Sequence, residues 1–110
     1  MKDDAGVVQL WTVSPRGGAP AQITRNQWPI DSTFTWSPDG RLLAHAMDNS
    51  ICVTELDSGR TTRLTPRSDD ATAPRPLACV FSPDGRKIAY QRIIGTGNDA
   101  FHQLFFVQVR

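Results

Sequence analysis

The stretch that decides the fold is WSPDGRLLAH, residues 36–45, because the chain contains it twice. The second copy, FSPDGRKIAY, covers residues 81–90 and begins 45 positions after the first, with no gap between the aligned residues. In both copies a Ser-Pro-Asp-Gly segment lies between stretches of apolar residues. This similarity predicts a structural unit that recurs along the chain.

Each Ser-Pro-Asp-Gly segment has the residue types of a tight turn between two strands. Pro38 suits the turn position where φ is about −65°, and Asp39 fits the position after it. Gly40 then supplies the left-handed conformation that closes the hairpin, so we predict a positive φ at Gly40 and at its counterpart Gly85. Two more segments that end in glycine, residues 15–18 and 57–59, predict a second kind of turn in each repeat.

Further similarities extend the repeat over most of the chain. Residues 10–24 and 51–65 match at their apolar, Gly and Ile/Leu-Thr positions with an offset of 41, and residues 9–13 resemble 103–107. A period of about 40–45 residues with several short strands is typical of a β-propeller blade. The longer spacing to the third copy is explained mostly by the polar stretch at 95–99.

The strands between the turns predict an all-β fold. We expect nine strands, at about residues 7–14, 20–25, 33–37, 41–47, 50–56, 60–65, 77–82, 86–93 and 102–109. They form a partial β-propeller of about two blades, built from four-stranded antiparallel sheets. The predicted division is a half blade at 1–32, a complete blade at 33–76 and a three-stranded blade at 77–110, all within one domain.

These residues resemble the TolB-type propeller repeat, a WD-repeat-like module with the core Trp/Phe-Ser-Pro-Asp-Gly-Arg-x-Ile/Leu-Ala. The segment Gly59 to Leu64-Thr65 also resembles the end of that repeat. Such repeats occur in periplasmic TolB, in the propellers of oligopeptidases and in oligogalacturonate lyase-like proteins. The resemblance implies a C-terminal fragment of a larger bacterial propeller protein, and it leaves both the periplasm and the cytoplasm open as the compartment.

Composition narrows the range of partners. The net charge is +1, with 12 Lys and Arg against 11 Asp and Glu, so no basic surplus favours nucleic acid or an anionic membrane. No apolar run is long enough to span a bilayer. No cofactor motif is present. Cys52 and Cys79 lie in apolar runs without CxxC spacing, which predicts two buried free thiols in preference to a disulfide or a metal pair.

The predicted loops place candidate binding residues on one rim of the propeller. The turns with Pro-Asp-Gly and Ser-Gly share one rim, whereas the connections 25–32, 66–76 and 94–101 emerge on the opposite rim and are longer. Binding residues concentrate on loops held by a rigid scaffold. The candidates on this rim are polar or aromatic: Arg25, Asn26, Trp28, Asp31, Arg67, Asp69, Asp70, Arg75, Asn98, Asp99 and His102.

Trp28 is the best single candidate, since an aromatic residue in a polar loop is a common hot-spot type; its alternative role is a lid over the core between blades. Residues 68–70, Ser-Asp-Asp, are far short of a calcium loop. His45 occupies the repeat position of Tyr90 and is interpreted as a packed strand residue. His102 alone makes neither a catalytic triad nor a metal site, so no catalytic or metal residue is predicted.

The function that the sequence favours is a non-catalytic scaffold that binds a protein or peptide through this rim. The alternative is the propeller portion of an enzyme, either an oligopeptidase-like hydrolase or an oligogalacturonate lyase-like protein. A third hypothesis is that these blades only complete a ring. Residues 102–109 form an apolar strand with no Pro and no formal charge, so we also expect self-association through open blade edges.

Overall fold

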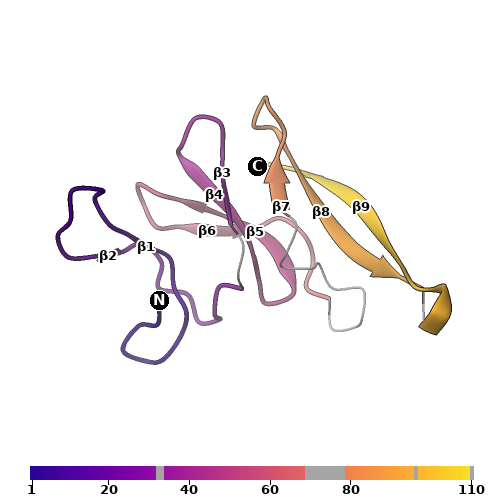
Figure 1. The fold of residues 1–110 in the computed structure, drawn as a ribbon, viewed down its shortest axis with the longest axis horizontal. Helices are drawn as coiled ribbons and strands as arrows, with labels where there is room; N and C mark the ends of the chain where they lie inside the picture. Colours follow the sequence, from indigo (N-terminus) through magenta and orange to yellow (C-terminus); the bar gives the residue numbers. More distant parts are fainter. Residues whose placement is uncertain (32–33, 69–78, 96, 110) are drawn as a thin grey trace.

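The computed structural model describes residues 1–31, 34–68, 79–95 and 97–109. Three antiparallel sheets of two, four and three strands follow one another along the chain and lie next to each other as consecutive blades (Figure 1). The first sheet contains β1 (Trp11–Thr12) and β2 (Ala21–Gln22). The second contains β3 (Thr35–Trp36), β4 (Leu42–Met47), β5 (Ser50–Glu55) and β6 (Thr61–Arg63). The third contains β7 (Cys79–Phe81), β8 (Lys87–Ile94) and β9 (Phe101–Gln108), with a short 3-10 turn η1 (Gly97–Asp99) between the last two.

The predicted fold class, an all-β partial propeller with nine strands, is confirmed, and each strand overlaps its expected range. The first two strands are much shorter than predicted, with only two residue pairs between them. Outside these pairs, the backbone N–H groups of the first blade form hydrogen bonds that are not part of the β1–β2 ladder. The Leu10 N–H donates to the Thr24 hydroxyl at 3.0 Å, and the Ile30 N–H donates to the Val8 carbonyl at 2.9 Å.

The two Ser-Pro-Asp-Gly turns have the same geometry. Gly40 and Gly85 both have φ of 74°, which confirms the predicted left-handed conformation. Asp39 holds the first turn from within, because its carboxylate accepts hydrogen bonds from the Ser37 hydroxyl at 2.6 Å and from the Arg41 N–H at 3.0 Å. The second turn repeats these bonds at the equivalent positions. The repeated motif is therefore a self-contained turn, with both polar side chains used inside it.

The second and third sheets pack through an apolar interface. Its buried residues come from β4, β5 and the residue after β6 on one side, and from β7 and β8 on the other: Ala44, Ile51, Val53, Leu64, Cys79, Phe81, Ile88 and Tyr90. Phe105 of β9 stacks on Tyr90, with ring centroids 5.8 Å apart. Cys52 and Cys79 are buried free thiols, as predicted, and burial raises their pKa values to about 11 and about 12.

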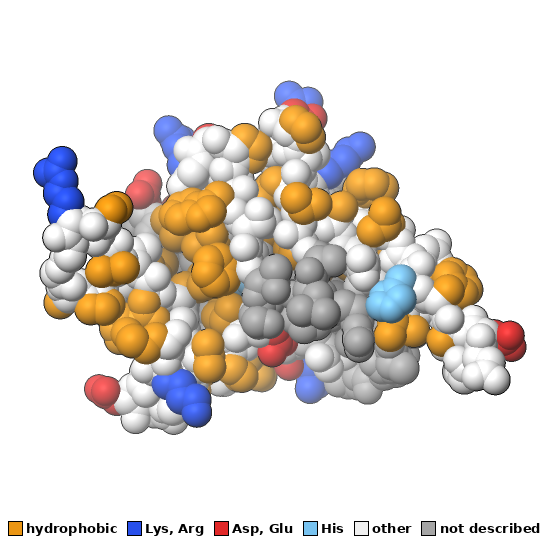
Figure 2. All heavy atoms as spheres, viewed as in Figure 1, with side chains coloured by type: hydrophobic (Ala, Val, Ile, Leu, Met, Phe, Trp, Pro, Cys, Tyr) orange, Lys and Arg blue, Asp and Glu red, His pale blue; other side chains and the backbone are white. Residues whose placement is uncertain are grey.

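Equivalent positions of the two repeats differ in exposure. Phe81 is 9% exposed because it faces the second sheet, whereas Trp36 is 54% exposed. Trp36 pairs with Leu43 and faces the first sheet, whose described part has only two short strands. Hydrophobic side chains accordingly form much of the surface over the first and second sheets in Figure 2.

The two faces of β9 also differ. Phe105 and Val107 pack against the apolar interface. On the other face Leu104 is 63% and Phe106 is 69% exposed. Within the described residues no further sheet packs on this face, so its apolar side chains stay open to solvent.

Substitutions at two turn glycines, Gly40 and Gly59, test the contact between the first and second blades. Gly40 and Gly59 both have φ of 74°, but only at Gly59 would an added Cβ overlap another residue, the carbonyl oxygen of Ile23 in the first blade. We expect Gly40→Ala to cost about 1–2 kcal/mol through backbone strain alone. Gly59→Ala should cost clearly more, because it also forces the first two blades apart. Urea unfolding of both variants measures the difference, and equal costs would contradict this view of the contact.

Candidate functional site

Two rims can be distinguished at the edges of the sheets. In Figure 1 the β3–β4 and β7–β8 turns lie at the top, and the β4–β5 turn lies toward the bottom together with the described parts of the connections between sheets. The lower rim carries most of the predicted site residues that the structure describes. Asp69, Asp70 and Arg75 lie outside the described residues.

The β4–β5 connection is a two-residue turn, shorter than the other connections on this rim. Asp48 and Asn49 form it with φ of 49° and 55°, a conformation of tight hairpins that Asp and Asn tolerate better than most residues. The sequence analysis did not select Asp48. An Asp-Asn pair between two apolar strands was the signal that would have revealed the turn, although not the contacts that its carboxylate makes.

Asp48 organises the rim through two arginines. Its carboxylate accepts from Arg63 Nη2 at 2.8 Å and from Arg67 Nε at 2.9 Å, and its side chain is only 8% exposed. Arg63 also donates to the Asp48 carbonyl and to the Ser50 hydroxyl. Charge-assisted bonds of this kind are stronger than neutral ones, so the Arg63 guanidinium is held in one orientation.

Trp28 lies against this fixed guanidinium. The Arg63 Cζ atom is 5.5 Å from the centre of the Trp28 ring, within the range of a cation–π contact. Trp28 is 42% exposed, so it does not act only as a lid over the core. An aromatic ring that is both positioned by a neighbour and open to solvent is suited to contact a partner.

The same rim continues to the third sheet. The Ser68 N–H donates to the Asn49 carbonyl at 3.2 Å, and Arg92 of β8 donates to the Ser68 hydroxyl at 3.1 Å. The Arg92 guanidinium lies 5.4 Å from the centre of the Phe105 ring. We call the connected residues the arginine rim: Trp28, Asp48, Arg63, Arg67, Ser68 and Arg92. Trp28 and Arg67 are the two of its members that the sequence analysis predicted.

Asn26, a predicted binding residue, makes hydrogen bonds to two other parts of the fold. Its side-chain amide donates to the Thr61 hydroxyl at 3.2 Å, and its backbone N–H donates to the Gln9 side-chain carbonyl at 3.1 Å. Gln9 in turn donates to the Asn26 carbonyl at 2.8 Å. These bonds hold the segment that carries Trp28 against the second sheet. Sequence spacing could not reveal them, because Asn26 and Thr61 come from different blades.

The remaining predicted residues do not join the arginine rim. Arg25 is exposed, and Asp31 is half-buried, with its pKa raised by burial. Asn98 and Asp99 lie exposed in the 3-10 turn between β8 and β9. His102 is exposed and lies 3.1 Å from the side-chain carbonyl of Gln91. In Figure 1 this end of the third sheet is far from the first sheet.

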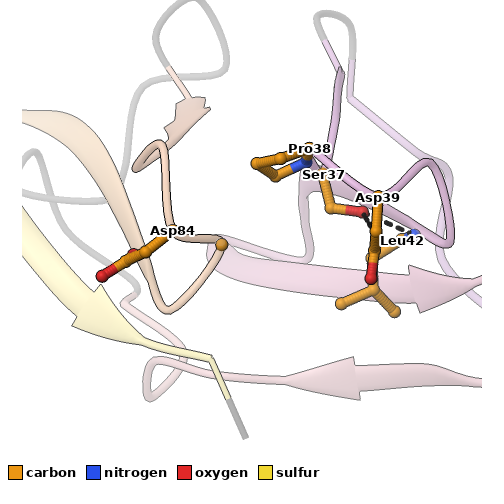
Figure 3. Close-up of a pocket in the computed structure, with 6 residues that line it drawn as sticks. Ser37, Pro38, Asp39, Leu42 and Asp84 are labelled. Carbon is orange, nitrogen blue, oxygen red and sulfur yellow. Dashed lines mark hydrogen bonds between the residues drawn. The ribbon is translucent and has the colours of Figure 1, made fainter.

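The opposite rim has a small hollow between the two Ser-Pro-Asp-Gly turns (Figure 3). It measures about 130 Å³ and is lined by Ser37, Pro38, Asp39, Leu42, Asp84 and Gly85. The serine hydroxyls lower the pKa values of Asp39 and Asp84, because each donates to the neighbouring carboxylate. These carboxylates stabilise the turns, which makes them poor candidates for proton transfer.

The described part of the chain has neither a metal-binding cluster nor a helix that could span a membrane. No group of three or more His, Cys, Asp or Glu residues there is placed to hold a metal ion. Among the same residues, no helix is long and apolar enough to cross a membrane.

Three consecutive antiparallel sheets, packed face to face, define the chain as a partial β-propeller. No family model matches it. The chain is 44% identical over 90 residues to a protein described as "Uncharacterized protein YidR" from Escherichia coli (strain K12). That alignment covers 82% of this chain and 21% of the relative, so the chain spans about a fifth of the relative's length.

Among solved structures, the chain is similar to the crystal structure of the tricorn protease, with a TM-score of 0.59. The match covers 86% of this chain and 9% of that chain, at 17% sequence identity. At this identity the likeness shows the fold alone.

Because Asp48 binds two arginines, its substitution should destabilise the chain more than substitution of Asn49, the other residue of the turn. Asp48→Asn keeps a residue that tolerates the turn conformation but removes the charge that two arginines share. We expect a loss of about 1–3 kcal/mol in the free energy of unfolding. Asn49→Asp, at the exposed neighbouring position, should stay within about 0.5 kcal/mol of wild type. Urea denaturation of both variants measures the difference. If the two variants are equally stable, Asp48 does not stabilise the fold through its two arginines.

Proposed function

We propose that the chain is part of a non-catalytic β-propeller scaffold of the TolB-like repeat type, which binds a protein or peptide partner through the arginine rim. The repeated Ser-Pro-Asp-Gly cores support the assignment of the repeat. The share of the relative that the chain spans supports a larger parent protein. The bacterial origin of that relative agrees with the resemblance.

One observation carries the binding proposal: Trp28 is exposed and at the same time held on a guanidinium that Asp48 fixes. Side chains that are already ordered lose little conformational entropy when a partner binds. Tryptophan and arginine are also the residue types that contribute most often to hot spots in protein interfaces. The arginine rim therefore combines suitable chemistry with a rigid support.

The partner contact predicts a specific effect of truncating Trp28. Linear peptides selected from a random display library against the wild-type chain serve as the probe. Trp28→Ala should weaken their binding about 30-fold or more, since hot-spot truncations cost about 2 kcal/mol or more. Trp36→Ala is the matched control, because Trp36 is 54% exposed but lies on β3, away from the arginine rim. Equal losses of peptide affinity in the two variants would contradict the proposal, and so would peptides whose binding depends on Trp36 and not on Trp28.

We also propose that the chain self-associates through the outer edge of β9. The Val109 N–H donates to the Arg86 carbonyl at 2.8 Å, so the odd-numbered residues of β9 direct their backbone groups toward β8. The even-numbered residues from His102 to Gln108 then direct theirs outward. This edge is eight residues long and has no Pro, Asp, Glu, Lys or Arg, so it lacks the usual protection against pairing.

A lysine substitution distinguishes edge pairing from packing between faces. Leu104→Lys places a charge on the open edge and should shift the chain toward monomer in equilibrium sedimentation at micromolar concentration. Val80→Lys is the control, because Val80 is 56% exposed but belongs to β7, on the other side of the sheet from that edge. If the edge pairs, Val80→Lys should leave association unchanged. A wild-type chain that is folded and strictly monomeric would refute edge pairing. Loss of association in both variants would indicate face packing, because Val80 and Leu104 lie on the same exposed face of the sheet.

A further inference from the structure

The inner edge of β1 is open, and it lies apart from the arginine rim. Within the described residues, β1 pairs with β2 alone. The equivalent strand of the second blade is β5, which pairs with β4 on its inner side and with β6 on its outer side. The described part of the first blade therefore has no strand at the place that β4 takes in the second blade and β8 takes in the third.

The backbone at this edge is directed so that it can pair with a further strand. On the β2 side, the Leu10 carbonyl accepts from the Ile23 N–H at 2.8 Å. On the inner side, the Gln9 N–H donates to the Met1 carbonyl at 2.9 Å. Because backbone groups alternate in direction along a strand, the N–H and carbonyl of Trp11 point to the same inner side as those of Gln9. An extended segment in line with Met1 can therefore form two hydrogen bonds with Trp11.

An apolar hollow of about 290 Å³ runs along the same edge. The residues that line it include Met1, Trp11, Thr12, Val13, Pro20 and Phe34. Phe34 comes from the second blade and is 53% exposed. Cys79, at the equivalent position of the third blade, is only 6% exposed, and it packs in one cluster with Leu42 and Ala44 of β4. The hollow thus corresponds to the place that β4 fills at the next interface between blades.

We propose that this edge and hollow bind an extended segment of the β4 type, antiparallel to β1. We call the site the strand acceptor and define it by Trp11, Thr12, Val13 and Phe34. In strand addition, main-chain hydrogen bonds supply affinity and pockets for alternate side chains supply specificity. The strand acceptor offers both, and it does not depend on partner binding at the arginine rim.

The repeat defines the chemistry of the segment. Both second strands of the repeat carry an aliphatic residue followed by alanine, Leu43-Ala44 in β4 and Ile88-Ala89 in β8. Ala44 faces the next blade, where its small side chain leaves room for the inner strand of that blade. At the strand acceptor the corresponding alanine faces Phe34. The segment belongs to a further repeat of the parent protein, because the chain matches only 21% of its relative and a protein of that length has room for more repeats.

A peptide with the sequence of residues 41–46, acetylated and amidated, serves as the probe, because it reproduces the equivalent strand of the second blade. The isotope-labelled full chain is titrated with this peptide, and the indole N–H signals of its three tryptophans are followed by NMR. Substitution of each tryptophan by phenylalanine assigns the signals. We expect the Trp11 signal to shift until it saturates, whereas the signal of Trp28, on the arginine rim, should stay in place.

Two N-methylated forms of the peptide test the backbone pairing. His45 of β4 pairs with Cys52, the residue equivalent to Trp11, so N-methylation at His45 of the peptide removes the donor to the Trp11 carbonyl. This change should weaken binding about tenfold or more. The backbone of Ala46 points the other way, since its carbonyl accepts from the Asp31 N–H in the fold. N-methylation at Ala46 is therefore the matched control and should change the affinity less than about twofold.

A pair of lysine variants of the chain tests the hollow. Phe34→Lys places a charge at an exposed position of the strand acceptor and should also weaken binding of the peptide about tenfold or more. Val80→Lys is the control, because Val80 is 56% exposed on the third blade. Equal affinities of the two N-methylated peptides, or of wild type and Phe34→Lys, would overturn the proposal, as would an unchanged Trp11 signal at millimolar peptide.

The tryptophan signals separate this proposal from the proposed function. A peptide of residues 41–46 that shifts Trp28 and not Trp11 would overturn the strand acceptor and leave binding at the arginine rim standing. Display-selected peptides that fail to bind at Trp28 would refute the proposed function, and the Trp11 signal would still test the strand acceptor.

Discussion

The β4–β5 hairpin is buried on both of its faces, and the rest of the structure depends on this. All residues from Leu43 to Met47 and from Ser50 to Thr54 are buried. A sheet covered on both sides needs a neighbour on each face. The first sheet and the third sheet supply these neighbours, which sets the order of the blades and brings loops from different blades to the same rim.

The two faces of the hairpin achieve burial by different means. Toward the third sheet, the hairpin packs against a cluster of hydrophobic residues that includes Tyr90, and the contact depends mainly on the area removed from water. Toward the first sheet, His45 and Thr54 are buried together with hydrogen-bond partners. These bonds lie within the second sheet and position the Thr61 hydroxyl at its edge. The Asn26 amide donates to that hydroxyl, so the segment that carries Trp28 is tied to the second sheet by a specific hydrogen bond as well as by apolar packing.

The candidate site shows where sequence reasoning reaches its limit. The rim was predicted from loop lengths and turn chemistry, and Trp28 and Arg67 were chosen because of their residue types. Asp48 was missed, since a two-residue turn predicts a hairpin and not a binding surface. Its importance comes from Arg63 and Arg67, which follow it by 15 and 19 positions. Asn26 was predicted to bind because it is a polar residue of a rim loop, and the sequence did not reveal its cross-blade hydrogen bond to Thr61.

The sequence by itself determined the local structure: two copies of Ser-Pro-Asp-Gly require the same turn, and alternation between turns requires strands, because backbone conformation depends on adjacent residues. It determined nine strands and the period of the blades in the same way. Only the tertiary structure decided what each strand face contacts. Trp36 and Phe81 occupy the same repeat position, yet one is exposed and the other buried. The physical reason is that burial depends on the neighbouring blade, which lies many residues away along the chain and is not encoded in the local pattern.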